Sequence, residues 1–425
     1  MRWNQWYSIR SYVRSSLWIV PFIALLLYVV IIRVIYMIDA WFAWVPLFPW
    51  GLSGTQTVLG TIVTLTLTFI VFTFGSLLVA IQIAGGQLTP RIIAATLLCD
   101  NAIRFTVGLF IFSLLFAAGV LARLETTVPH GVAAIAGLLG FGSLAAFLYL
   151  IDYAARLLRP GSIVWRVGEA GRAVIESVYP DPAEVSSVAA TPRRKLPPTA
   201  QTVDHHGRSA IVLAVNLKAL VAAAQKAKVI IELVPRVGDF VATGEPLFRL
   251  YGDAGPIDSR RLGELVAFGP ERTIEQDSTF AFRIIVDIAI KALSKAINDP
   301  TTATLAIDQL QRLLRMVGSR HLHNDELKDS SGQLRLIFRT PNWEDFVQLT
   351  FSEIRLYGAE NFQIARRLRA MIETLLQTLP EYRHPALRGE LELLDRALEK
   401  LYALPQDVAL ARVPDRQGLG GSSRP

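Results

Sequence analysis

Four long apolar runs dominate the first 160 positions of the chain, and a mixed polar pattern follows them. A helix needs roughly 20 apolar residues to cross a bilayer core about 30 Å thick. The pattern therefore predicts an α-helical membrane protein with four transmembrane helices, over Leu17–Ile38, Val58–Ala84, Phe105–Leu121 and Val132–Ile151.

The arginines predict which side of the membrane each connection occupies. They recur before the first run, between the second and third, and after the fourth, at Arg2, Arg10, Arg14, Arg91, Arg104, Arg156, Arg159, Arg166 and Arg172. The opposite connections carry mainly Arg123 and the aromatic run WFAWVPLFPW at 41–50, which suits a membrane interface. Cytoplasmic connections carry the excess of Lys and Arg. We therefore expect a multi-pass membrane protein with both termini in the cytoplasm.

Small and polar side chains follow one face of the second run. At about 100° per residue they fall within a stripe roughly 60° wide, which comprises Thr57, Thr61, Thr64, Thr68, Gly75, Gln82 and Gly86. Two interpretations remain open. Threonine hydroxyls bond to carbonyls one turn back and small residues let membrane helices approach closely, which predicts a packing surface. Hydroxyls and an amide that replace the hydration shell of an ion predict instead a helix lining a water-filled path.

The polar half begins after Arg159-Pro160-Gly161. Ile163–Val178 has the pattern of an amphipathic helix, and the proline-rich segment at 179–200 that of a linker. SAIVLAV and KVIIELV predict strands on either side of a short helix at Leu217–Lys226. In PRVGDFVATGEPLFRL, turns at Gly238-Asp239 and at Gly244-Glu245-Pro246 predict tight hairpins.

The remaining sequence predicts mainly helices. Asp277-Ser278 can cap a first helix, on which Arg283, Asp287 and Lys291 lie four apart as compensating charges. Further on, the pattern predicts a strand and three helices, at Leu334–Arg339, Trp343–Tyr357, Ala359–Leu379 and Pro385–Leu401. The tail ARVPDRQGLGGSSRP is rich in Gly and Ser, which predicts mobility, although VPDRQGLGG also has the look of a docking strip.

Asn298-Asp299-Pro300 interrupts the helical pattern. The simplest interpretation makes Asp299 an N-cap and Pro300 the first helical residue, where a missing N–H costs nothing. A second interpretation places Asn298 and Asp299 beside Glu275, Gln276 and Asp277 in a polar, cation-binding niche. The candidate residues of this region are Arg272, Thr273, Gln276, Asp277, Arg283, Asp287, Asn298, Asp299 and Pro300.

Composition narrows the possible functions. The chain is 52% hydrophobic, and 43 Lys and Arg against 36 Asp and Glu give a net charge of +7. Because the arginines flank apolar runs, we interpret them as topology signals and expect no nucleic-acid partner. The single Cys99 excludes an intrachain disulfide, and the His pairs at 205–206 and 321–323 lack a third ligand at metal-site spacing. No P-loop, GxGxxG, HExxH or GxSxG occurs in a fitting context, so we expect no catalytic residues, cofactor or metal.

Two resemblances carry the interpretation further. PRVGDFVATGEPLFRL resembles a half-motif of the biotinyl/lipoyl-type barrel-sandwich hybrid, V-x-x-G-D-x-V-x-x-G-x-x-L, but has no lysine at an exposed turn. Over almost its whole length the chain resembles the bacterial membrane proteins of domain of unknown function 2254. The similarity rests on QLTPR, on FGPERTIEQDSTFAFRIIVDIAIKALSKAINDPTTA, on IRLYG and on the terminal ARVPDRQGLGG. The resemblance implies a bacterial inner-membrane protein with four spans and a cytoplasmic C-terminal domain, and it implies no activity.

The predicted fold is a four-helix membrane domain joined to an α+β cytoplasmic domain with a small barrel-sandwich-hybrid-like element and a helical bundle. The predicted boundaries are a cytoplasmic N-terminus at 1–16, the transmembrane domain at 17–158, a helix and linker at 159–200, a β-rich subdomain at 201–270, a helical subdomain at 271–403 and a flexible tail at 404–425.

Two functions fit this organisation. One is a homo-oligomeric ion channel or transporter-like pore with a cytoplasmic regulatory domain. The other is a membrane-anchored sensor or scaffold whose cytoplasmic domain binds a partner or small ligand. A membrane enzyme has the least support, because no nucleophile, base and orienting group occur together.

The arginine pattern makes the topology testable. Reporter fusions at Arg91 and at the C-terminus should report the cytoplasm, and fusions near Trp44 and Pro129 the outside. Activity of paired phosphatase and fluorescent-protein reporters measures this in cells. A C-terminus outside the cytoplasm would overturn the assignment.

Overall fold

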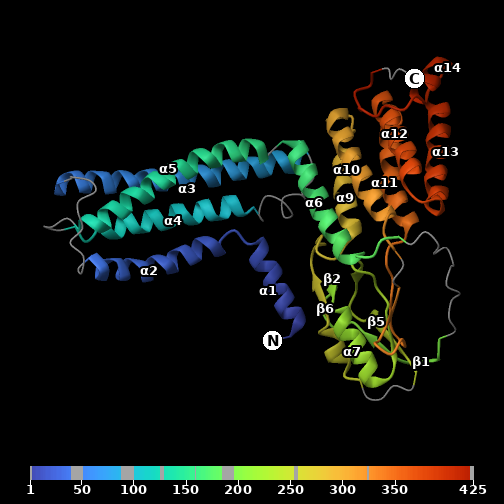
Figure 1. Ribbon diagram of the computed structural model, residues 1–425, viewed down its shortest axis with the longest axis horizontal. Helices are drawn as coiled ribbons and strands as arrows, with labels where there is room; N and C mark the ends of the chain where they lie inside the picture. Colours follow the sequence, from blue (N-terminus) through green and yellow to red (C-terminus); the bar gives the residue numbers. More distant parts are fainter. Residues whose placement is uncertain are drawn as a thin grey trace. The chain divides into compact units, whose positions relative to one another are not determined.

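The computed structural model describes residues 2–39, 51–87, 100–124, 129–157, 159–183, 196–252, 257–322 and 325–421 (Figure 1). The aromatic run at 41–50, Arg91, Cys99 and His323 lie outside the described residues. The chain forms two compact units. We call residues 12–86 and 90–163 the apolar unit, and residues 1–11, 87–89 and 164–425 the C-terminal unit.

The apolar unit is built from the four predicted helices. They are α2 (Ile19–Asp39), α3 (Leu52–Gln87), α4 (Asn101–Leu121) and α5 (His130–Leu157). Among the described residues these four are long and apolar enough to cross a membrane. The prediction of four spans is confirmed to this extent.

Helix α4 is the centre of this unit. Its apolar window is 56% buried, against 11% to 22% for the other three helices. Small residues let the neighbouring helices approach: a Cβ at Gly108 would overlap Val20 of α2, and one at Gly119 would overlap the Tyr28 hydroxyl. On the side of α5, Ser143 Oγ donates to Ser113 Oγ at 2.9 Å in the buried interface. Close packing and one polar contact therefore hold α2 and α5 against α4.

The C-terminal unit contains two sheets. The larger has the strand order β1-β5-β3-β8-β7 and the smaller β4-β2-β6. All pairs are antiparallel except β3 with β8. The strands are β1 (Thr199–Asp204), β2 (Ala210–Val215), β3 (Ile230–Leu233), β4 (Phe240–Val241), β5 (Pro246–Tyr251), β6 (Val266–Gly269), β7 (Glu326–Lys328) and β8 (Leu334–Phe338). Helix α7 (Leu217–Ala227) joins β2 to β3 as predicted, and α8 (Ser259–Gly263) precedes β6.

The predicted hairpins around Gly238 and Gly244 are both wrong, because the strands on either side of each turn lie in different sheets. Strand β4 pairs with β2 in the small sheet, whereas β5 pairs with β1 and β3 in the large one. The turn therefore carries the chain from one sheet to the other, because turn residues specify a reversal but not the strand with which the next segment pairs. The structure does not confirm a barrel-like element.

Helices form the rest of the unit. They are α1 (Trp3–Ser15) and α6 (Pro160–Val178), which contribute residues to both units, then α9 (Ser278–Ala292), α10 (Pro300–Gly318), α11 (Trp343–Gly358), α12 (Phe362–Thr378), η2 (Glu381–Arg383), α13 (His384–Leu401) and α14 (Pro405–Ala411). Ten of the 15 residues of α9 are buried. Helix α9 lies beside α10 and α11, so it is the core helix of this layer (Figure 1).

The C-terminal segment differs from the predicted flexible tail. Residues 405–421 form α14 and a strap that lies along α12. The carboxylate of Asp415 accepts from the amides of Gln417, Gly418 and Gly420, at 3.0, 2.9 and 2.6 Å. Arg366, which is 1% exposed, donates to the carbonyls of Val413 and Gly420. The VPDRQGLGG motif therefore docks on its own chain.

The break after α9 has the predicted geometry. Asp299 Oδ1 accepts from the Thr302 amide at 3.0 Å, and Oδ2 accepts from the Thr302 hydroxyl at 2.5 Å. Asn298 has a φ of +49°, a left-handed conformation that Asn tolerates better than most residues. Pro300 begins α10. A left-handed residue, a cap and a proline thus stop one helix and start the next.

The cap can be tested by substitution. Asp299→Ala should lower the free energy of unfolding by about 0.5–2 kcal/mol, because the Thr302 amide loses its acceptor. Asp299→Ser restores an acceptor at the same position and should recover most of that loss. Chemical denaturation of the full chain in detergent, followed by fluorescence, measures both. Equal destabilisation by Ala and Ser would contradict a simple cap.

Candidate functional site

The surface of α3 is divided into three sectors. One faces the other helices and contains the buried positions Thr55, Leu59, Ile62, Thr66, Phe69, Thr73, Leu77 and Ala80. Two flanks carry large exposed apolar side chains, at Leu65, Leu67, Phe72, Phe74, Leu78 and Ile83, and two exposed valines, Val71 and Val79, lie at the edges of the stripe itself. The predicted stripe, from Thr57 to Gly86, is exposed and lies about 200° around the helix from the buried sector. Most of the stripe, from Thr64 to Gly86, therefore points away from the rest of its own unit, whereas Thr57 and Thr61 line a groove between α3 and α5.

The stripe hydroxyls have partners on their own helix. The hydroxyls of Thr57, Thr61, Thr64 and Thr68 each donate to the carbonyl four residues earlier, at 2.8 to 3.0 Å. A hydroxyl oxygen that donates its one hydrogen inward keeps its lone pairs free to accept. The outward side of the stripe thus offers acceptor oxygens, which suit cations better than anions.

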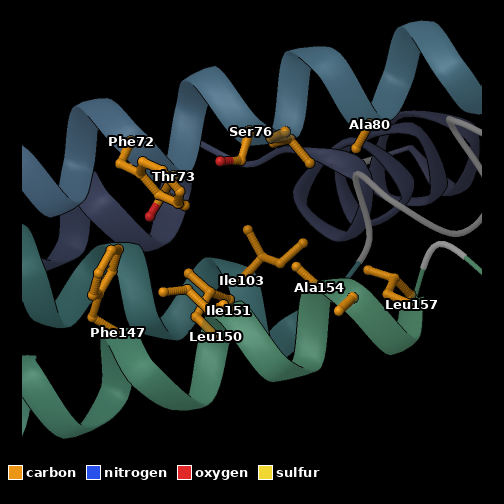
Figure 2. Close-up of a pocket in the computed structure, with 12 residues that line it drawn as sticks. Phe72, Thr73, Ser76, Ala80, Ile103, Phe147, Leu150, Ile151, Ala154 and Leu157 are labelled. Carbon is orange, nitrogen blue, oxygen red and sulfur yellow. The ribbon is translucent and has the colours of Figure 1, made fainter.

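Two apolar grooves separate α3 from α5. The first, about 270 Å³, lies between Thr57–Phe69 of α3 and Gly137–Leu144 of α5. The second, about 200 Å³, lies between Phe72–Ala80 of α3, Ile103 of α4 and Phe147–Leu157 of α5 (Figure 2). Helix α3 therefore meets its neighbour along open grooves rather than along a closed seam.

The start of α9 holds a buried polar cluster. Asp277 is 5% exposed, and its Oδ1 accepts from the Phe280 amide at 3.1 Å and from the Thr279 hydroxyl at 2.5 Å. Its Oδ2 has no hydrogen-bond partner among the described residues and lies over Gly238, where a Cβ would overlap it. Gly238 has a φ of +93°, so both the space and the backbone favour glycine there.

Further buried hydroxyls lie along the segment before α9. The hydroxyls of Tyr7, Tyr179 and Thr273 make no hydrogen bond of good geometry among the described residues, although Tyr7 lies beside Thr273 and Glu275, and Tyr179 beside Ser278. Burial raises the pKa of Tyr179 to about 12, and burial together with the nearby Glu275 carboxylate raises the pKa of Tyr7. Burial also raises the pKa of Asp277, against the opposing charge of Arg272. The segment therefore holds several polar groups that favour their neutral forms.

The predicted cation niche is not assembled. Asp277 and Asn298-Asp299 flank opposite ends of α9, whose 15 residues are about 22 Å long. Gln276 Oε1 accepts from the Val215 amide at 2.9 Å, which ties the segment to β2. Arg283 bonds to Asp287 on its own helix and to Glu353 of α11, which joins the two helices. Of the candidates, the structure brings together Arg272 with Asp277 near Gly238, and Arg283 with Asp287.

A family model described as a predicted membrane protein (DUF2254) matches residues 14–374. The chain belongs to this family. Uncharacterised proteins of Mycobacterium bovis and Mycobacterium tuberculosis are each 26% identical over 361 residues, which covers 81% of this chain and 68% of theirs. No solved structure matches the chain.

Several residues outside the long family motif at 268–303 contact it in the structure. Tyr7, Tyr179, Gly238 and Glu353 meet the motif from four separate segments, and of these only Gly238 is marked by its local sequence. Gly238 could be found from the sequence because Gly-Asp is typical of a turn, and its positive φ agrees with that. Among the described residues, no three His, Cys, Asp or Glu side chains are grouped to hold a metal.

The raised pKa of Asp277 makes stability depend on pH. Between the pKa of the unfolded chain, about 3.9, and the higher folded value, the unfolded carboxyl loses its proton while the folded one keeps it. Stability therefore falls as pH rises through that window. Asp277→Asn cannot ionise and still offers an acceptor to Phe280. We expect the variant to melt at a higher temperature than the parent at pH 7, and the difference to vanish below about pH 4.

Fluorescence-detected melting of the full chain in detergent, at several pH values, measures this difference. Asp239→Asn is the matched control, because its carboxylate caps the Arg236 amide in a half-buried turn. A difference between Asp277→Asn and the parent that stays constant with pH would show that ionisation of Asp277 is not its cause.

Proposed function

We propose that the protein is a homo-oligomeric membrane protein in which α3 faces the assembly axis and lines a path for cations. The observation that carries the proposal is the exposed stripe of α3, opposite the buried sector and between two large apolar flanks. The flanks are suited to lipid, whereas small and polar residues mark contacts between membrane helices. A second copy of the chain is the partner that this stripe fits.

The shape of the stripe supports close approach. A Cβ placed at Gly60, Gly75 or Gly86 would meet nothing within 4 Å, so these positions are open in a single chain. Copies arranged around an axis would bring their stripes together. The threonine oxygens would then line the axis with acceptors that can replace water around a cation. The C-terminal unit, which we propose to be cytoplasmic, would regulate the path.

A second function is favoured by one observation on the C-terminal unit. Leu356 and Tyr357, in the IRLYG motif of α11, are 72% and 57% exposed. Large apolar side chains exposed within a family motif are typical of a surface that contacts another molecule. A membrane-anchored scaffold that binds a partner through α11 is therefore the alternative.

The cation path predicts a pattern of chemical accessibility. With Cys99 replaced by serine, single cysteines at Thr61, Thr64 and Thr68 should react with a small, charged thiol reagent in liposomes. Cysteines at Ile62 and Phe69, in the buried sector, and at Leu65, on a flank, should react many-fold more slowly, because lipid and protein exclude the reagent. The rate of modification, read by mass spectrometry, measures the pattern.

Cation flux into the same liposomes completes the test. Modification of a cysteine at Thr64 should reduce the flux, whereas the Cys99→Ser parent should be unaffected by the reagent. Protection of all six positions, with no flux, would favour dry helix packing and the scaffold function. Reactivity at all six would contradict the placement of α3 itself.

A further inference from the structure

Helix α1 has contacts near both of its ends. In its first half, Tyr7 packs against Ala214 and Ala267 of the small sheet. In its last turn, the carbonyl of Val13 accepts from Arg104 Nη2 at 2.9 Å. Arg104 is the fourth residue of α4 and lies at the end of that apolar span. The last turn of α1 is therefore fixed at the level where the membrane begins.

The exposed face of α1 is apolar. Trp6, Ile9 and Val13 are 46%, 48% and 40% exposed, and at about 100° per residue they fall within a sector roughly 60° wide. We call these three residues the apolar sector of α1. Ile9 and Trp6 lie about 6 and 10 Å from Val13 along the helix axis. The headgroup layer extends about 5–8 Å beyond the hydrocarbon core, so the sector lies within reach of it.

The charge and the aromatic residues of α1 also suit a membrane surface. The helix sequence WNQWYSIRSYVRS contains two arginines and no Asp or Glu. The Arg10 guanidinium lies over the Trp6 ring, 5.1 Å from its centroid. Trp18 Nε1 donates to the Tyr12 hydroxyl at 3.1 Å, one position before α2 begins. Basic, apolar and aromatic side chains on one helix are typical of helices that lie in the membrane interface.

Helix α6 repeats this arrangement where the chain leaves the fourth span. Helix α5 ends at Leu157 and α6 begins at Pro160. Trp165, about 8 Å further along α6, is 51% exposed, and the Arg312 guanidinium lies 4.4 Å from the centroid of its ring. The two described helices that belong to both units thus each carry an exposed tryptophan with an arginine over the ring.

We propose that the apolar sector of α1 lies in the headgroup layer of the membrane and that Arg10 binds anionic lipid headgroups there. Trp6, Ile9 and Val13 point toward the acyl chains, and the positive charge beside them attracts headgroup phosphates. A second copy of the chain fits the sector less well, because three side chains supply far less than the roughly 800 Å² that each partner buries in a stable protein interface. The proposal does not depend on α3 or on the cation path.

The test uses the full chain, with Cys99 replaced by serine, in nanodiscs of phosphatidylcholine and the anionic phosphatidylglycerol. A small fluorophore is attached to the cysteine of Ile9→Cys or of Ser8→Cys. Ser8 is the matched control, because it is exposed and adjacent but lies roughly 130° around α1 from the centre of the apolar sector. We expect lipids with a nitroxide just below the headgroup to quench the label of Ile9→Cys, and iodide in the water to quench that of Ser8→Cys.

The role of charge is tested with two nitroxide lipids at the same mole fraction, one a phosphatidylglycerol and the other a phosphatidylcholine. The anionic lipid should be enriched beside the Ile9→Cys label. Arg10→Gln in the same background should lower the enrichment by up to about fivefold, as loss of one arginine near an anionic surface implies. Arg10→Lys keeps the charge and should keep the enrichment.

Three results would contradict the proposal. Quenching of the Ile9→Cys label by iodide as strongly as that of Ser8→Cys would place the apolar sector in water. Protection of the Ile9→Cys label from iodide and from both nitroxide lipids would show that protein covers the sector. Equal quenching by the two lipids, unchanged in Arg10→Gln, would overturn the binding of anionic headgroups.

Discussion

A helix inside a bilayer has no water to satisfy its polar atoms, so each hydroxyl and amide needs a partner in protein or lipid. This constraint explains the arrangement of the apolar unit. The helices α2 to α5 each satisfy their own backbone, and the threonines of α3 donate inward to carbonyls one turn earlier. Because those bonds are made within α3 and need no neighbouring helix, α3 can carry many threonines while most of its surface stays exposed. Ser113 and Ser143 satisfy each other across α4 and α5. Among the described threonines of α3, Thr73 alone does not make such a bond.

The C-terminal unit is organised around a buried helix with a defined start and end. Asp277 caps the start of α9, and Asn298-Asp299 turns the chain into α10 beyond its end. Between them, Arg283 joins α9 to α11 through Glu353. The long family motif therefore coincides with the core helix and its two boundaries. Much of its specificity is accounted for by folding, and the groups that folding leaves unexplained are Asp277 Oδ2 and the neighbouring hydroxyls.

Sequence reasoning succeeded where local chemistry decides the structure. The four apolar runs, the helix between β2 and β3, and the Asp299 cap follow from periodicity and capping, which act over a few residues. Sequence reasoning failed where segments far apart in the sequence determine the structure. The turn at Gly244 was recognised, but β4 and β5 join different sheets because their partners lie in other parts of the chain. The cation niche failed for a related reason: residues that flank a helix of 15 residues are separated by its length. The tail docks because Arg366 donates to the carbonyls of Val413 and Gly420 and its own carbonyl accepts from the Asp415 amide, all more than 40 positions away in the sequence.

Periodicity identified the stripe of α3 but not the meaning of Thr73. In the sequence, Thr73 is one more threonine on the side away from the stripe, together with Thr55 and Thr66. Only coordinates distinguish a hydroxyl that donates to its own helix, as Thr66 does, from one that does not. The two sides of α3 then have different surroundings: most of the stripe is exposed, whereas Thr73 lines an apolar groove beside α5, and this difference lies in the tertiary packing rather than in the threonine pattern.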